Sequence, residues 1–246
     1  MAALGGTKSL AADAPATGRE YYELRAYRLK AGAGHAVLDA YLEKGLIPEL
    51  NSSGVPAVGV FTEPEAKDGD AVWVLIPRKT LDGFAGVVVG GDRDAATKAY
   101  FAASTKERPA FERVDTWLLR AFTGFPQAAV PALKRDGKDR IFELRTYHSF
   151  NEEKARLKVE MFHGGEIGLM QQLGMSPVFY GEGLAGSDLP HLTYMLCNSD
   201  KDTHAKAWKA FFDDPVWLKL KNDPRYADTV NRVESRFLVP AAFSQI

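Results

Sequence analysis

The feature that most constrains this chain is an internal repeat. The segment Tyr22-Glu-Leu-Arg-Ala-Tyr27 recurs 120 residues later as Phe142-Glu-Leu-Arg-Thr-Tyr147, with four of six positions identical. The same offset aligns Gly54 with Gly174, and Arg113-Val-Asp-Thr-Trp-Leu-Leu119 matches Arg232-Val-Glu-Ser-Arg-Phe-Leu238 at an offset of 119. A register that holds over so many residues indicates a tandem duplication of one domain.

Each copy is predicted to contain strand, helix, strand, strand, helix and strand, in that order. Period-two alternation is typical of a strand, and apolar residues at helical spacing predict an amphipathic helix. In the first copy we expect strands at 21–29, 57–62, 71–76 and 114–121, a helix ending near residue 50, and an irregular, glycine-rich second helical region. In the second copy we expect strands at 142–147, 177–181, 191–197 and 230–239, helices at 151–173 and 202–212, and a short helix carrying Trp217.

This order of elements is that of a ferredoxin-like α+β unit, whose two helices cover one face of a sheet and leave the other face bare. Two copies in one chain can cover each other's bare faces by packing sheet to sheet, as a pseudo-twofold dimeric α/β barrel. The predicted organisation is a tail at 1–19, a first domain at 20–122, a linker at 123–139 and a second domain at 140–246.

Composition excludes several classes of function. Lys and Arg number 31 against 32 Asp and Glu, so the chain lacks the basic excess that neutralises nucleic-acid phosphates. No stretch approaches the roughly 20 apolar residues of a transmembrane helix. The single cysteine, Cys197, lies in an apolar run and is interpreted as a buried, inert thiol. A homo-oligomer built from intrachain barrels is left open.

The first residues bear on the compartment. Residues 1–16 are rich in small residues and contain Ser9-Leu-Ala11 and Ala12, which resemble the end of a secretory signal. They have neither a positively charged start nor a full apolar core. They are read either as a signal remnant of an exported, periplasmic or extracytoplasmic protein, or as a disordered tail of a cytoplasmic one.

The sequence resembles the NIPSNAP family in four features. These are the opening Tyr-Glu-Leu-Arg-x-Tyr strand, the helix after it, the glycine-bounded second strand and the closing Arg-Val-(Asp/Glu) strand. The resemblance covers about residues 20–122 and 140–243, and it implies the dimeric α/β-barrel class. The first copy departs from the family pattern in its second helix, where glycine replaces the apolar stripe. Related barrels include cofactor-free monooxygenases, haem-degrading enzymes and binding modules, so the resemblance implies a fold rather than an activity.

The first strand of each copy supplies the candidate binding residues. Alternation places Tyr22, Leu24 and Ala26 on one face, which we expect to contact the helices. The opposite face is then expected to point into the barrel, where arginine would hold an anionic group and tyrosine would orient a planar ligand. Alternatively, the acids and arginines only neutralise each other. The candidate ligand-binding residues are Glu23, Arg25, Tyr27, Glu143, Arg145 and Tyr147.

Two residues are candidates for catalysis. His163 lies three residues before Glu166 in a predicted helix, a spacing that could hold a metal-ligand pair or a general base with its orienting acid, or form an ordinary solvated face. Tyr147 is the second candidate. No zinc-binding HExxH motif, phosphate loop, dinucleotide fingerprint or nucleophile elbow is present, so we expect neither a metal nor a cofactor.

Three functions remain consistent with the sequence. The first is binding of a small apolar or aromatic ligand, in the barrel or in the cleft between sheet and helices. The second is a cofactor-independent monooxygenase-like activity on an aromatic or polyketide-like substrate. The third is a structural scaffold with a fully packed barrel. A cavity of about 300 Å³ or more would disfavour the scaffold, and His163 or Tyr147 poised beside it without a partner would favour the enzyme.

Overall fold

Eight strands of the described chain form one closed antiparallel barrel. The computed structural model describes residues 18–30, 34–65, 70–85 and 95–246. Around the barrel the strand order is β1-β3-β2-β8-β5-β7-β6-β4. The first four strands and the last four have the same internal order, and the two sheets join at the β2–β8 and β4–β6 seams. The prediction that two copies build one barrel is confirmed.

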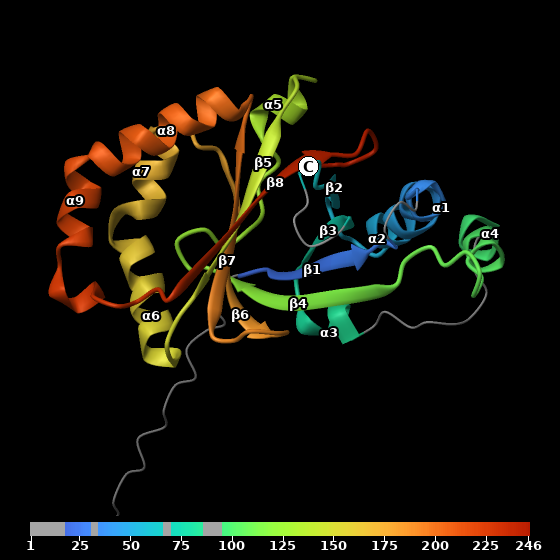
Figure 1. The fold of residues 1–246 in the computed structure, drawn as a ribbon, viewed down its shortest axis with the longest axis horizontal. Coiled ribbons are helices and arrows are strands. Elements are labelled where there is room, and N and C mark those ends of the chain that lie inside the picture. The colour runs from blue at the N-terminus through green and yellow to red at the C-terminus, as the bar shows by residue number, and fades with distance from the viewer. Residues whose placement is uncertain (1–17, 31–33, 66–69, 86–94) are drawn as a thin grey trace, which may run out of the picture.

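The elements follow the predicted order in both halves. The strands are β1 (Tyr21–Arg28), β2 (Gly59–Thr62), β3 (Ala71–Arg78), β4 (Arg113–Ala121), β5 (Ile141–His148), β6 (Pro177–Ala185), β7 (His191–Asn198) and β8 (Arg232–Pro240). The helices are α1 (Ala36–Tyr41), η1 (Leu42–Leu46), α2 (Ile47–Ser52), α3 (Leu81–Ala85), α4 (Ala95–Ala103), α5 (Ala132–Arg135), α6 (Glu152–Met161), η2 (Phe162–Glu166), α7 (Ile167–Gln172), α8 (Lys201–Asp213), α9 (Pro215–Lys221) and η3 (Pro224–Tyr226). The main helices of the two halves lie on opposite sides of the barrel (Figure 1).

The repeated sequence produces repeated local structure. In each half the first long helix contains a π-helical turn, η1 or η2, at positions 120 residues apart. Two residues after each of these helices ends, a glycine has positive φ, +93° at Gly54 and +70° at Gly174. The next amide closes the turn, because Val55 N donates to Leu50 O and Met175 N donates to Met170 O, both at 3.0 Å. Glycine is required there because a side chain disfavours this backbone conformation.

The central part of the barrel interior is apolar and packed, which corrects the prediction that the charged face of β1 points into it. Tyr22, Leu24 and Ala26 point into the barrel, where they are at most 3% exposed. Cys197 is also buried there, and burial raises the pKa of its thiol to about 12, so it is no nucleophile at neutral pH. Other members of this core are Phe61, Trp73, Leu75, Leu119, Ala121, Phe142, Leu144, Val178, Phe179, Met195, Leu238 and Ile246.

The candidate charged residues therefore face the helices, and their predicted orientation into the barrel is wrong. This applies to Glu23, Arg25, Tyr27, Glu143, Arg145 and Tyr147. The physical reason is enclosure. Away from its ends, the barrel interior is shielded from water by both sheets, and an ion there would lose its hydration without replacement. The layer between sheet and helices has a margin open to water and supplies polar partners from the helices.

The second helical region differs between the halves. In the second half Asp200 caps α8 by accepting from Thr203 N at 2.7 Å, and Asp214 caps α9 by accepting from Val216 N. In the first half α3 and α4 flank residues 86–94. The predicted glycine-rich region includes Gly86, Gly90 and Gly91, which lie outside the described residues, as do residues 1–17. No helix among the described residues has the length and apolar character needed to cross a bilayer.

Candidate functional site

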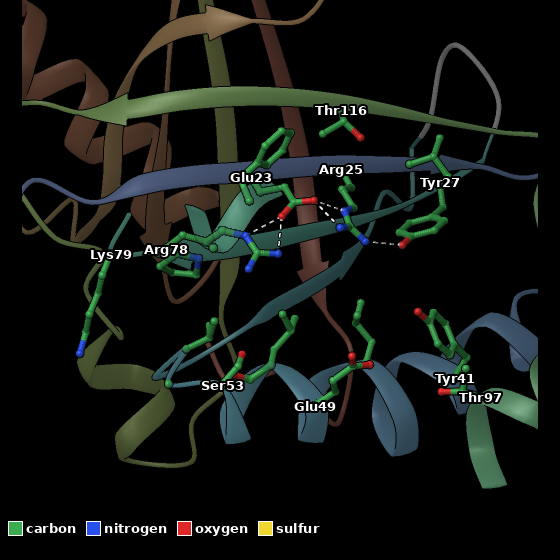
Figure 2. Close-up of a pocket in the computed structure, with 18 of the residues that line it drawn as sticks. Glu23, Arg25, Tyr27, Tyr41, Glu49, Ser53, Arg78, Lys79, Thr97 and Thr116 are labelled. Atoms are coloured by element: carbon green, nitrogen blue, oxygen red, sulfur yellow. Dashed lines mark hydrogen bonds and ion pairs between the residues drawn. The ribbon is translucent and has the colours of Figure 1, made fainter. Parts of the chain in front are cut away.

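A large cleft lies in the first half, between the outer face of its sheet and the helices α1, α2 and α4. Its volume is about 760 Å³, which is within the usual range for small-molecule sites. Glu23, Arg25 and Tyr27 point from β1 across the cleft toward Glu49 and Ser53 on the α2 side (Figure 2). The structure thus brings the three first-half candidates together in one cleft.

The floor of the cleft is a buried cluster of one acid and two arginines. Glu23 accepts from Arg25 Nε at 2.6 Å through Oε1, and from Arg78 Nε at 2.7 Å through Oε2. The side chains of Glu23, Arg25 and Arg78 are only 3%, 12% and 5% exposed. Arg25 Nη1 also donates to Tyr27 Oη at 3.1 Å. Burial opposes the charge of Arg25, but Tyr27 and Glu23 outweigh burial and raise its pKa. The floor therefore carries one positive charge in excess.

Sequence reasoning missed Arg78, although a signal was present. Val72, Val74 and Ile76 alternate along β3 and all pack against the helices. Arg78 continues this alternation at the end of the strand, opposite Tyr21 of β1, so its side chain falls on the same face. The alternation could have placed Arg78 beside Glu23 once the facing of β1 was known.

Aromatic rings form much of the wall. Tyr41 and Tyr100 stack with ring centroids 4.2 Å apart, and Tyr27 meets Phe111 edge to face at 5.2 Å. Phe101 also lines the cleft and is half exposed. Burial raises the pKa of Tyr100, so its phenol stays protonated at neutral pH. The cleft therefore offers ring faces and a cationic floor to the same ligand.

The matching position in the second half is filled. Glu143 accepts from Arg145 Nη1 at 2.6 Å, and α8 places Trp208 Nε1 at 2.9 Å and His204 Nε2 at 3.0 Å from its other oxygen. Burial raises the pKa of Glu143, but His204, Arg145 and Ser235 outweigh burial and lower it to about 2. The guanidinium of Arg145 lies 4.6 Å from the Trp208 ring. Glu143 and Arg145 are thus paired beneath α8.

Tyr147 is enclosed rather than poised for catalysis. Its hydroxyl lies 2.8 Å from the hydroxyl of Tyr194, and burial raises the pKa of both phenols. Next to them Lys158 Nζ pairs with Glu166 at 2.6 Å, with both side chains less than 5% exposed. The raised phenol pKa values and this packing favour a structural role for Tyr147.

His163 lies far from the cleft on an exposed part of η2. Its Nε2 accepts from Gly124 N at 3.0 Å, and its ring packs on Phe122 with centroids 5.4 Å apart. Glu166 is buried and bound to Lys158, so the predicted pairing of His163 with Glu166 is wrong. The π-helical turn is the reason, because its wider winding removes the usual alignment of residues three apart. His163 instead contacts the backbone of the linker at Gly124.

Comparison with known proteins places this architecture in a family. The sequence profile of the NIPSNAP family matches residues 142–245. The second half of the chain is therefore a NIPSNAP domain. The matched half is the one in which α8 covers the Glu-Arg-Tyr strand. No curated protein shows a significant match to the chain.

Solved structures resemble the chain over nearly its whole length. A proposed monooxygenase from Fusobacterium nucleatum subsp. nucleatum has a TM-score of 0.57 at 10% identity, covering 91% of this chain and 93% of that one. A proposed monooxygenase from Lactobacillus acidophilus NCFM has a TM-score of 0.59 at 6% identity, covering 90% and 94%. An anthrone oxidase-like protein has a TM-score of 0.51 at 12% identity, covering 92% and 93%. At these identities the likeness shows the fold alone.

No group of three or more His, Cys, Asp or Glu side chains in the described part of the chain is arranged to hold a metal ion. The cleft residues are instead arginines, tyrosines and phenylalanines, which bind organic ligands by charge and ring contact. The arrangement suits recognition of an organic anion.

Proposed function

We propose that this protein binds a small aromatic compound with an acidic group in the cleft of its first half. The observation that carries the proposal is the 760 Å³ cleft over a floor with one excess positive charge. Most of the barrel interior, by contrast, is filled by packed apolar side chains. The proposal therefore favours the cleft over the barrel as the ligand site.

The charges of the lining residues support an acidic ligand. Among the described lining residues, the cations Arg25, Arg78 and Lys79 outnumber the carboxylates Glu23 and Glu49. A hydrogen bond to a charged group contributes about 1.5–3 kcal/mol, more than a neutral one, and the low dielectric near a buried floor strengthens it. A ligand carboxylate at the floor would neutralise the positive charge that remains after Glu23 has paired with the two arginines.

The aromatic wall supports a planar ring. Tyr27, Tyr100 and Phe111 present their rings to the same space in which the arginines lie. Aromatic pairs contribute about 0.5–1.5 kcal/mol beyond the area that they bury. The ring contacts would supply affinity, and the floor would select for the acid.

The test compares an acid with its neutral analogue. Isothermal titration of the full chain is expected to show tighter binding of 2-naphthoate than of 2-naphthylmethanol. In Arg78→Asn the preference for the acid should fall about tenfold or more, because a charged partner is lost. Asn198 occupies the matching place in the second half, so this substitution copies a side chain that the fold already accepts.

Arg135→Asn is the matched control, since Arg135 is exposed and far from the cleft in the linker. It should leave both affinities unchanged. The proposal is overturned if neither compound binds, or if Arg78→Asn leaves the preference for the acid intact. Absence of binding by aromatic acids would leave the scaffold reading, which the packed barrel supports.

An oxygenase function is the second candidate, supported by the fold shared with proposed monooxygenases and an anthrone oxidase-like protein. Such a reaction on anthrone would convert its CH2 to C=O, with one oxygen of O2 bound to carbon and the other leaving as water with the two hydrogens. Tyr27, whose hydroxyl accepts from Arg25, would be the proton-handling group. Oxygen consumption above the uncatalysed rate, lost in Tyr27→Phe, would establish this function. No excess consumption would leave binding as the activity.

A further inference from the structure

A second hollow lies inside one end of the barrel, on the opposite face of the sheet from the cleft. It is formed where β1 and β5 end and β3, β7 and β8 begin, and its volume is about 50 Å³. A water molecule needs roughly 10–15 Å³ measured in this way, so the hollow fits a ligand of three or four heavy atoms. We call it the barrel-end chamber; the residues used below are Arg28, Trp73, His148, His191, Thr193 and Arg236.

Two polar atoms of the chamber residues have no hydrogen-bond partner among the described residues. They are Nε1 of Trp73 and Nε2 of His191, and each residue is only 4% exposed. The other ring nitrogen of His191 lies 3.3 Å from Thr193 Oγ1. Buried polar groups are nearly always satisfied, and an unsatisfied one costs about 1–3 kcal/mol. Since the indole N–H can only donate, the missing partner of Trp73 must be an acceptor.

Two guanidinium groups, each paired with one carboxylate, lie beside the indole. Arg28 and Arg236 lie 5.9 and 5.6 Å from the centroid of the Trp73 ring. Arg28 binds Asp115 through Nε at 2.8 Å, and Arg236 binds Glu63 through Nη1 at 3.3 Å.

The carboxylates around the chamber are already occupied. Of the two lining carboxylates, Asp188 contacts Arg232 at 3.4 Å, and Glu234 contacts His148 Nε2 at 3.3 Å and Arg232 at 3.1 Å. Nearby, Asp115 is held by Arg28 and Glu63 by Arg236. An incoming ligand would therefore meet donors that remain to be satisfied, and acceptors that already have partners. This favours a ligand that is rich in acceptors.

We propose that the barrel-end chamber binds a small planar oxyanion of the formate, nitrate or bicarbonate class. One oxygen would accept from Trp73 Nε1, and others would accept from Arg28 and from His191 Nε2. The chamber is too small for the aromatic acid assigned to the cleft, and the sheet separates the two sites. The proposal is therefore independent of the function proposed for the cleft.

The test observes the indole N–H directly. The chain has four tryptophans, and the ¹H–¹⁵N indole signal that disappears in Trp73→Phe identifies that of Trp73. Titration with formate or nitrate at constant ionic strength is expected to move this signal saturably. The signal of Trp208 is an internal control that should not move, because its Nε1 already donates to Glu143. No saturable movement up to about 100 mM anion overturns the proposal, since any weaker site is negligible.

Variants separate the chamber from other anion effects. Arg28→Met should weaken the effect about tenfold or more. Arg113→Met removes a neighbouring exposed charge, opposite Arg28 on β4, and should change nothing. Arg78→Asn should also leave the titration unchanged.

An equal loss in Arg113→Met would mean general screening, and a loss in Arg78→Asn would place the anion in the cleft. Either result overturns the proposal. If Arg28→Met does not fold, the wild-type titration and the Arg78→Asn variant still decide the question.

Discussion

The two halves of the molecule carry the same Glu-Arg-Tyr strand and use it in opposite ways. In the second half α8 lays Trp208 and His204 on Glu143, and the layer between sheet and helices is closed. In the first half the equivalent Glu23 lies on the floor of a 760 Å³ cleft. The strand motif is therefore a structural element of the fold in both halves. Whether it lines an open cleft depends on the helices that pack over it.

The partners of the two glutamates show how each arrangement is balanced. Glu143 is satisfied by one arginine and by polar groups of α8 and β8. Glu23 is satisfied by two arginines, because Arg78 stands where the second half has Asn198. Replacing a helix's polar groups with a second cation keeps the acid paired and leaves a positive charge facing the cleft.

Removing Trp208, which covers Glu143 in the closed half, should lower stability far more than a comparable change in the open half. Trp208→Ala deletes a buried ring and a partner of Glu143, so we expect a loss of about 3–5 kcal/mol in the free energy of unfolding. Phe101→Ala, in the wall of the open cleft, should cost less than about 0.5 kcal/mol because Phe101 is half exposed. Urea unfolding followed by circular dichroism measures both. Equal losses would contradict the view that only one half is closed.

A second contrast concerns the ion pair buried beneath α9. Lys158 and Glu166 stand where the first half has Leu38 and Leu46, which belong to its apolar core. Glu166→Leu alone should cost about 3–5 kcal/mol, because it leaves a buried ammonium unpaired. Adding Lys158→Leu should restore stability to the wild-type value or above, since the pair then becomes the leucine pair of the first half. A double variant as unstable as the single one would refute this reading.

The loss of stability at acidic pH should reveal the contribution of Glu143 in the closed half. The pKa of Glu143 in the folded protein, about 2, lies below its ordinary value of 4.5. The ionised carboxylate therefore stabilises the fold above pH 4.5, and this contribution of about 3 kcal/mol is lost as the pH falls through 2. Urea unfolding between pH 7 and pH 2 should show a flatter profile for Glu143→Gln than for wild type. Glu152→Gln, at an exposed helix start, is the control and should keep the wild-type slope.

The smallest expected effect is at His163. His163→Ala removes the acceptor of Gly124 N and should cost about 1 kcal/mol or less, because the site is exposed. Ligand binding in the cleft should not change. A loss of binding or turnover in this variant would return His163 to the list of functional residues.

Several residues of the cleft could be predicted from the sequence, but the residues that surround them could not. The repeat located Glu23, Arg25 and Tyr27 as special positions, and the structure places all three in the cleft. Alternation along β3 pointed to Arg78 without showing what lay opposite. The rings of Tyr100 and Phe111 come from segments with no repeat signature, so only their packing reveals them.

By itself, the sequence determined that this chain is two copies of one unit, where the strands and helices of each copy lie, and that the copies share a barrel. Local patterns carry this information, because alternation, helical spacing and the glycines at 54 and 174 act over a few residues. Only the tertiary structure decided which face of β1 is enclosed and which half is open. Alternation defines two faces of a strand, but burial of a face depends on the elements that pack against it, and these come from distant parts of the chain.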